Sequence, residues 1–347
     1  MDSVTQIVLG AAVAETTLGH KVGRKAMVWG AVLGTLPDLD VLIRYANPVD
    51  NFTYHRSFSH SIFVLSLLTP LIVWLILKIH PQTHEQRKGW FWLVWLVLMT
   101  HILLDAMTIY GTQLFWPFWT TPVGLGSIFI IDPLYTVPMA LGLLAVLWLR
   151  RSELAAATAR KWLIFSIAIS TTYLGWSAAA QAYLQQQVSS QLHQQGIDSR
   201  NTLVTPAPFN TLLWRFVTRV DGGYYEGMIS LLDQKSELSY RFYPSRDDLL
   251  PKLESMPTAQ RLQWFTKGYY AVSTDHDEVI ITDLRMGVEP DYAFAFSIAQ
   301  KNQDQLHSVT PTHKRTLRYS DEKFDWIIRR ISDQSLPLPV GNFGPIH

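Results

Sequence analysis

Long apolar stretches in the first 185 residues constrain this chain more than any other feature. A bilayer core of about 30 Å needs roughly 20 apolar residues in a helix. Three segments meet that length plainly: Ser61–Ile79, Gly89–Met107 and Lys161–Leu184. Three more are shorter, interrupted, or bounded by polar residues: Val4–Gly19, Ala26–Ile43 and Ile130–Leu149. The sequence therefore predicts an α-helical polytopic membrane domain with about six membrane segments.

Charge density divides the chain into two parts. Residues 1–185 carry 12 Lys/Arg and 9 Asp/Glu, whereas residues 186–347 carry 17 and 19. We expect residues 1–185 to form the membrane domain and residues 186–347 to form a soluble domain. The formal net charge of +1 excludes a strong polyanion binder, so no nucleic-acid partner is expected. The absence of cysteine excludes a disulfide-rich module.

The second part is expected to be a small α+β domain. Leu212–Val220 and Tyr224–Leu232 flank Asp221-Gly222-Gly223, a pattern typical of a β-hairpin. Further strands are expected at Tyr269–Ser273, Glu278–Leu284 and Tyr292–Ile298, and helices at Ala180–Gln195, Arg246–Ser255 and Thr258–Phe265. Ser332–His347 is rich in Pro and Gly and is expected to be a loose end.

Lys and Arg in the short loops predict the orientation of the chain. Loops after the first, third and fifth segments hold ten of them: Lys21, Arg24, Lys25, Lys78, Arg87, Lys88, Arg150, Arg151, Arg160 and Lys161. The alternate loops hold two, Arg44 and Arg56. We therefore expect the basic loops in the cytoplasm, with the N-terminus and the soluble domain extracytoplasmic.

Small residues predict close packing between the first two segments. Gly30 and Gly34 form a Gly-x-x-x-Gly pair, and Gly10 with Ala14 forms a looser version. Such spacing lets two helix backbones approach closely. The loop over residues 110–126 has no Lys or Arg and is rich in aromatics, Gly and Pro, which indicates either a lid or re-entrant packing.

Ionisable side chains inside or beside the spans are the strongest functional signal, because burial in a membrane is costly. In chain order they are Asp38, Asp40, His55, His60, His101, Asp105 and Asp132. Counting about 1.5 Å per residue from the cytoplasmic helix starts, four of them fall about 18–27 Å across the bilayer: Asp38, His60, His101 and Asp105. One such residue alone is more often a hydrogen-bonded structural group. Because several segments place ionisable side chains at a similar depth in the membrane, the sequence predicts a functional site there.

The local spacing of these residues suits a metal ion. His101 and Asp105 are four residues apart, so they project from the same face of a helix. Pro37 interrupts regular helical pairing, and we expect the chain to unwind near Asp38 and Asp40. His55 and His60 bracket the start of the third span, which Ser59 could cap. Arg56 between them is a cation suited to a phosphate or a carboxylate.

Four short motifs follow one another within residues 1–140. They are Met1-Asp-Ser-Val-Thr-Gln-Ile-Val-Leu-Gly10, Leu36-Pro-Asp-Leu-Asp40, His55-Arg-Ser-Phe-Ser-His-Ser61 and His101-Ile-Leu-Leu-Asp105. Together they resemble the YdjM-type membrane-bound metal-dependent hydrolases. The resemblance implies a bacterial inner-membrane protein in which six residues match the metal-binding positions: Asp38, Asp40, His55, His60, His101 and Asp105. Many members have His where this chain has Gln6, and Asp2 or a water could take its place.

We therefore expect a divalent-metal hydrolase with one or two ions, and zinc is favoured because nitrogen and oxygen ligands are mixed. Asp40 or Asp105 would act as the base, Arg56 would hold a phosphate oxygen, and Asp132 is a further candidate ligand. A site in the outer half of the bilayer favours an amphiphilic substrate entering from the membrane lipid, such as a lipid phosphoester.

Two other classes of function remain open at this stage. A transporter or proton-coupled channel would need polar groups that reach both faces, and the cytoplasmic halves of the spans offer only Glu15. A non-catalytic envelope sensor or scaffold would use the metal structurally and bind a partner through the soluble domain.

Overall fold

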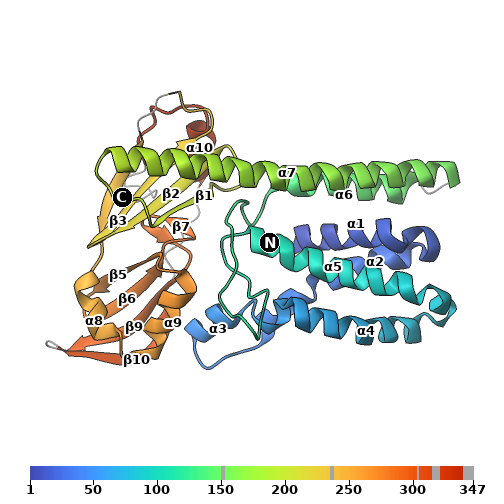
Figure 1. The fold of residues 1–347 in the computed structure, drawn as a ribbon, viewed down its shortest axis with the longest axis horizontal. Helices are drawn as coiled ribbons and strands as arrows, with labels where there is room; N and C mark the ends of the chain where they lie inside the picture. The colour runs from blue at the N-terminus through green and yellow to red at the C-terminus, as the bar shows by residue number, and fades with distance from the viewer. Residues whose placement is uncertain (150–152, 235–237, 303–304, 315–320, 339–347) are drawn as a thin grey trace. The chain divides into compact units, whose positions relative to one another are not determined.

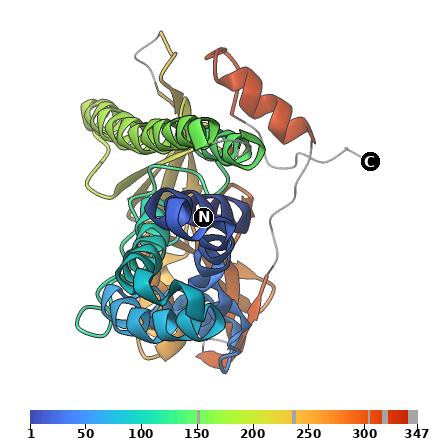
Figure 2. The same ribbon diagram turned by 90° about the vertical axis from the view of Figure 1, so that its right-hand side faces the viewer.

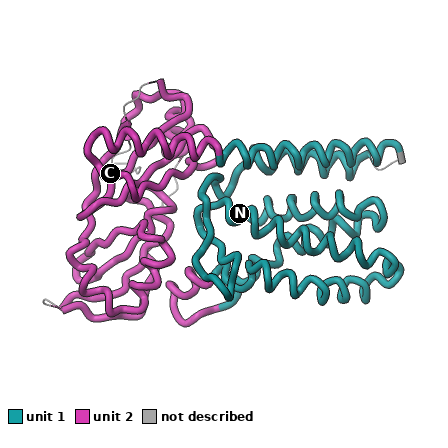
Figure 3. The backbone as a smooth tube through the Cα atoms, viewed as in Figure 1, with its two compact units in different colours: residues 1–43, 55–178 teal, residues 44–54, 179–347 magenta. Residues whose placement is uncertain are grey.

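The computed structural model describes residues 1–149, 153–234, 238–302, 305–314 and 321–338. The chain forms two compact units (Figure 3). The helical unit comprises residues 1–43 and 55–178, and the β unit comprises residues 44–54 and 179–347. A helical N-terminal region is thus followed by a β-rich domain, and an excursion of eleven residues from the first region belongs to the second unit.

The helices of the helical unit run side by side (Figure 1). They are α1 (Ser3–Val22), α2 (Arg24–Thr35), α4 (Ile62–Ile79), α5 (Arg87–Met107), α6 (Pro133–Leu149) and the first part of α7 (Glu153–Gln194). Short 3₁₀ turns join them: η1 (Pro37–Leu42), η2 (Phe58–His60) and η3 (Pro81–Gln86). The predicted unwinding at Pro37 is confirmed, because α2 ends at Thr35 and η1 begins at the proline.

Three helices among the described residues are long and apolar enough to cross a membrane: Ile62–Ile79, Pro81–Met107 and Leu154–Gln194. They correspond to the three segments whose length was plain in the sequence. Pro133–Leu149 is an apolar helix but shorter. The second predicted segment, Ala26–Ile43, becomes a helix of only 12 residues followed by the 3₁₀ turn η1.

Helix α1 occupies the centre of the helical unit, where it packs against α2, α5 and α6 (Figure 2). The predicted close packing of small residues is confirmed. A Cβ atom on Gly30 would collide with the carbonyl oxygen of Gly10 and the Cβ of Ala14, and one on Gly34 would collide with the carbonyl of Gln6. The α1 and α2 backbones therefore touch directly, which larger residues would prevent.

We predict that Gly30→Ala destabilises the helical unit by about 1–3 kcal/mol, because the added methyl group forces α1 and α2 apart. Gly175→Ala is the matched control, since a Cβ on Gly175 meets no heavy atom within 4 Å. Thermal unfolding of the purified protein in detergent measures both. Equal melting temperatures for Gly30→Ala and Gly175→Ala would contradict the prediction.

The β unit contains two antiparallel four-stranded sheets. The first has the order β1-β2-β3-β4 and the second β10-β9-β6-β5. The strands are β1 (Thr202–Pro206), β2 (Leu213–Val220), β3 (Gly223–Ser230), β4 (Ser239–Pro244), β5 (Tyr270–Asp275), β6 (Glu278–Asp283), β9 (Ala295–Asn302) and β10 (Gln305–His313), with the two-residue strands β7 (Gly287–Val288) and β8 (Asp291–Tyr292). Its helices are α3 (Pro48–Tyr54), η4 (Asp247–Leu249), α8 (Leu250–Leu253), α9 (Pro257–Thr266) and α10 (Asp321–Arg330).

The second half of α7 forms part of the core of the β unit. Ala180, Leu184, Val188 and Leu192 recur every four residues and pack against the first sheet. The helix predicted at Ala180–Gln195 is thus confirmed, and it packs against the first sheet. Two glutamine side chains of α7 also donate hydrogen bonds to carbonyl oxygens of the edge strand β1. Gln181 donates to Val204 at 2.8 Å and Gln185 donates to Thr202 at 3.0 Å.

The predicted hairpin is confirmed, with Gly222 in the left-handed region at φ +76° between β2 and β3. The three further strands and both further helices are also present, as β5, β6, β9, η4 with α8, and α9. Strands β1, β4, β7 and β10 and helices α3 and α10 were not predicted from the sequence. Arg150, Arg151 and the last nine residues of the predicted loose end lie outside the described residues.

A buried polar cluster joins the first sheet to the short β8 strand. Arg215 donates to Glu226 Oε2 at 2.7 Å, and the hydroxyl of Tyr292 donates to the same oxygen at 2.6 Å. The hydroxyl of Tyr224 donates to Glu289 at 2.6 Å. Burial raises the pKa of the Glu289 carboxyl above its ordinary value. Glu289 therefore binds a proton more readily in the folded protein than in the unfolded chain.

We predict that Glu289→Gln becomes more stable relative to wild type as the pH rises from about 4 to 7. The raised pKa makes wild-type stability fall over this window, because the folded state binds more protons, whereas glutamine does not titrate. Thermal unfolding as a function of pH measures the difference. Asp248→Asn should show the opposite slope, since the hydrogen bond from Arg246 lowers the pKa of Asp248. Parallel curves for Glu289→Gln and wild type would refute the assignment.

Candidate metal centre

Four side chains from three segments converge at one end of the helical unit. Asp38 comes from η1, His60 from η2, and His101 and Asp105 from the last turns of α5. Each offers one ligand atom, and the four atoms lie within 4.8 Å of one another. His60 and Asp105 are fully buried and His101 is 1% exposed, whereas the Asp38 side chain is 21% exposed. The group therefore has one partly open side, at Asp38.

The distances within this group match a tetrahedral ion site. Five separations involve the Nε2 atom of His60 or His101, and they run from 3.2 Å to 3.7 Å. Zinc–ligand distances of about 2.0–2.1 Å in a tetrahedron place neighbouring ligand atoms about 3.4 Å apart. Five of the six separations are thus close to those that a single tetrahedral ion requires, and the sixth, between Asp38 and Asp105, is at most 4.8 Å.

Hydrogen bonds at the other ring nitrogens define which histidine atoms face the group. Nδ1 of His101 lies 2.7 Å from the carbonyl oxygen of Gly34, which can only accept, so Nδ1 carries the proton. Ser59 uses its single hydroxyl proton on Oδ2 of Asp40, so its oxygen accepts from Nδ1 of His60 at 3.0 Å. In the neutral form of each ring, Nε2 therefore presents its lone pair to the group.

With both rings neutral, four acceptor atoms face one another without a donor between them. Oδ1 of Asp38 is buried and has no hydrogen-bond partner among the described residues. The two Nε2 atoms lie 3.3 Å apart. A cation satisfies this arrangement, and so would a second proton on each ring; metal measurements separate the two cases.

Asp40 and His55 lie beside the group rather than in it. Oδ1 of Asp40 lies 2.7 Å from Nδ1 of His55, and Oδ2 accepts from the backbone N–H of Arg56 at 2.9 Å and from the hydroxyl of Ser59. Residues two apart on a 3₁₀ turn point in different directions. Asp38 therefore faces the group while Asp40 organises the segment that carries His55 and His60.

Arg56 is the positive charge next to the group. Its Nη1 lies 3.4 Å from Oδ1 of Asp105 and 3.4 Å from Thr108 Oγ1. Its backbone is in the left-handed region, at φ +63°, which non-glycine residues rarely adopt. Hydrogen bonds to Asp40 and from Gln113 hold it there. Its buried Nε has no acceptor among the described residues.

The three further candidates differ in position. Gln6 donates to Oδ1 of Asp105 at 3.1 Å and to the carbonyl of His101 at 3.3 Å, so its amide orients a member of the group. The amine of Met1 contacts the same Asp105 oxygen. Asp2 caps α1 by accepting from the N–H groups of residues 4 and 5. Asp132 caps α6 and accepts from the hydroxyl of Tyr173 at 2.9 Å.

The role of Ser59 was missed by sequence reasoning. The expected helix cap at Ser59 is wrong, because Ser61 caps α4 by accepting from the N–H groups of Phe63 and Val64. Either serine precedes the helix closely enough to cap it. Only the position of Asp40 in space shows that Ser59 serves His60 instead.

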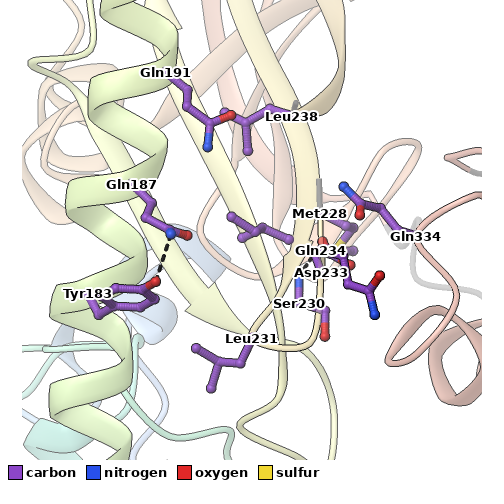
Figure 4. Close-up of a pocket in the computed structure, with 11 residues that line it drawn as sticks. Tyr183, Gln187, Gln191, Met228, Ser230, Leu231, Asp233, Gln234, Leu238 and Gln334 are labelled. Atoms are coloured by element: carbon purple, nitrogen blue, oxygen red, sulfur yellow. Dashed lines mark hydrogen bonds between the residues drawn. The ribbon is translucent and has the colours of Figure 1, made fainter. Parts of the chain in front are cut away.

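A separate hollow of about 180 Å³ lies within the β unit, between α7 and the end of β3 (Figure 4). Tyr183, Gln187 and Gln191 line one side of it, and Gln187 donates to the Tyr183 hydroxyl at 2.8 Å. The acid in its wall, Asp233, is already paired with Arg330 at 2.8 Å. The hollow is polar but brings no group of titratable side chains together, so it is not the candidate centre.

We predict that the purified protein binds one divalent ion per chain and that His101→Ala abolishes binding. Ser59→Ala should weaken the affinity about 10–100-fold, because the proton on Nδ1 of His60 loses its acceptor. Ser66→Ala is the matched control, since that serine accepts one hydrogen bond from Trp95 on the same helix bundle. Metal analysis and competition titration measure these effects. A wild-type protein without metal would show that the rings are protonated instead.

The first part of the chain is similar to a known family of membrane proteins. A family model described as "YdjM inner membrane protein" matches residues 1–184, which contain all four residues of the group. The chain is also similar to the "Uncharacterized protein YfhP" of Bacillus subtilis (strain 168). The two are 24% identical over 308 residues, which cover 85% of this chain and 89% of that protein. No solved structure matches this chain.

Proposed function

Because this chain belongs to the YdjM family of inner membrane proteins, we propose that it is a membrane-embedded, divalent-metal-dependent hydrolase of amphiphilic phosphoesters. The single observation that carries the proposal is the convergence of four potential ligand atoms, from Asp38, His60, His101 and Asp105, within 4.8 Å of one another. The mixed nitrogen and oxygen ligands favour zinc. A divalent ion held there supplies Lewis acidity toward a phosphoryl oxygen and toward water.

The proposed topology has six membrane segments, with α1, α2 and α6 joining the three plainly long helices. The basic residues between α1 and α2 and between α4 and α5 would face the cytoplasm. The candidate centre lies at the opposite ends of these helices, at the start of α1 and the end of α5. This topology places the centre near the outer face and the β unit outside the cytoplasm.

Within this proposal His55 is the general acid–base. Asp40 holds its Nδ1 at 2.7 Å, which leaves Nε2 free to exchange a proton, and the His55 side chain is 21% exposed. His55 takes the proton of the attacking water and returns it to the leaving alcohol oxygen. The earlier candidates for the base, Asp40 and Asp105, use their oxygens on neighbouring groups.

Arg56 is proposed to bind the phosphoryl group. Its Nε lacks an acceptor among the described residues, and its position against Asp105 puts a fixed positive charge beside the group of ligands. A phosphoryl oxygen would complete its hydrogen bonds. The substrate would be a membrane lipid or another amphiphile that enters sideways, because the centre lies in the outer half of the membrane in the proposed topology.

We predict that the metal-loaded protein in lipid nanodiscs hydrolyses a lipid phosphoester. His55→Ala should lower kcat about 10²–10⁴-fold with the metal retained, because it removes proton transfer but no ligand. His60→Ala should lose both metal and activity. His84→Ala, a change in the η3 turn, serves as the control and should behave as wild type.

One observation favours a second candidate, a non-catalytic sensor with a structural metal. Three of the four ligands are buried, and structural zinc sites are closed, whereas catalytic ones keep a position open. Only Asp38 offers an opening. Full metal loading combined with no hydrolysis across a panel of lipid phosphoesters would favour the sensor and overturn the hydrolase.

A further inference from the structure

Residues 44–54 belong to the β unit although their neighbours on both sides belong to the helical unit (Figure 3). The segment therefore leaves the candidate metal centre after η1 and returns to it at His55. Asp40 lies four residues before its start, and His55 follows its last residue directly. Whatever holds this segment also constrains the chain that carries the ligands.

Phe52 anchors the segment in an aromatic pocket of the β unit. Its ring centroid lies 4.3 Å from that of Phe294, 4.8 Å from Phe265 and 5.4 Å from Phe296. These rings come from α9 and from the chain entering and forming β9. Phe52 is only 6% exposed, so it is a buried anchor rather than a surface contact.

Arg261 of α9 clamps the same segment from the side. Its guanidinium lies 3.8 Å from the centre of the Tyr54 ring and 3.7 Å from Oδ1 of Asp50, and its Nε donates to Thr53. Tyr54 in turn stacks on Tyr45, with centroids 4.8 Å apart. This stack joins the two ends of the segment.

The segments on either side of residues 44–54 are short 3₁₀ turns. η1 has six residues and η2 has three, and 3₁₀ turns have poorer hydrogen-bond geometry than α-helices. Such short elements depend on outside contacts for their geometry. Asp40 and His55 pair with each other at 2.7 Å, so a displacement at residue 54 acts on η1 and η2 together.

We propose that the β unit positions the metal centre through segment 44–54, with Phe52 and Arg261 as positioning residues. This inference rests on the proposed function, because it assumes that Asp38 and His60 hold an ion. Contacts inside the β unit fix segment 44–54, and the chain on both sides of it carries Asp38, Asp40, His55 and His60. A change in the β unit, such as the binding of a partner, would thereby alter the affinity of the centre.

The experiment compares metal binding by full-length variants in nanodiscs, using Zn²⁺ for affinity and Co²⁺ absorption for coordination geometry. Phe52→Ala and Arg261→Ala should each weaken Zn²⁺ affinity about 10-fold and change the Co²⁺ spectrum, because the ligands are less well oriented. Phe52→Leu and Arg261→Lys, which keep part of the packing or the charge, should recover most of the affinity.

Arg219→Ala is the matched control. Arg219 also lies in the β unit, pairs with an acid, Asp247 at 3.1 Å, and lies over a tyrosine ring, Tyr270 at 5.6 Å. The Arg219→Ala substitution should destabilise the β unit without changing the affinity for Zn²⁺. Unchanged affinity in Arg261→Ala and Phe52→Ala, or an equal loss in Arg219→Ala, would overturn the inference. A wild-type protein that binds no metal would instead refute the proposed function.

Discussion

Two imidazole nitrogens and two carboxylate oxygens meet at one end of the helical unit, and the local structure is arranged around them. Burying a charged carboxylate costs several kcal/mol unless it is paired. Arg56 and Gln6 share the outward oxygen of Asp105, which leaves its other oxygen to the group. With both rings neutral no hydrogen-bond donor separates the four atoms, so the arrangement needs either a cation at its centre or further protons on the rings.

The glycine contact between α1 and α2 is part of the same construction. Because Gly34 has no side chain, α2 approaches α1 at the backbone of Gln6. The backbone carbonyl of the same Gly34 accepts a hydrogen bond from Nδ1 of His101. Gln6 meanwhile reaches Asp105. Helix packing and ligand orientation therefore depend on the same few residues, so a change that separates these helices would also disturb the centre.

The sequence was sufficient to predict the parts of the centre that lie within regular elements or at a proline. His101 and Asp105 share a helix face because of their spacing, and Pro37 ends α2 because it cannot continue the pairing. Sequence reasoning could not assign the roles of Asp40, His55 and Ser59. Their contacts cross between two short turns separated by a loop, and no periodicity relates such residues.

By itself the amino-acid sequence determined that the first part of the chain forms apolar helices, that His and Asp residues occur near their ends, and that a domain containing strands and helices follows. Apolar length, helix period and hairpin turns are local properties of a chain. Only the tertiary structure decided that four of the six predicted ligands form one group, that Asp40 pairs with His55 and Ser59 instead, and that residues 44–54 pack within the β unit. Those outcomes depend on contacts between residues far apart in sequence, which are selected by packing in three dimensions.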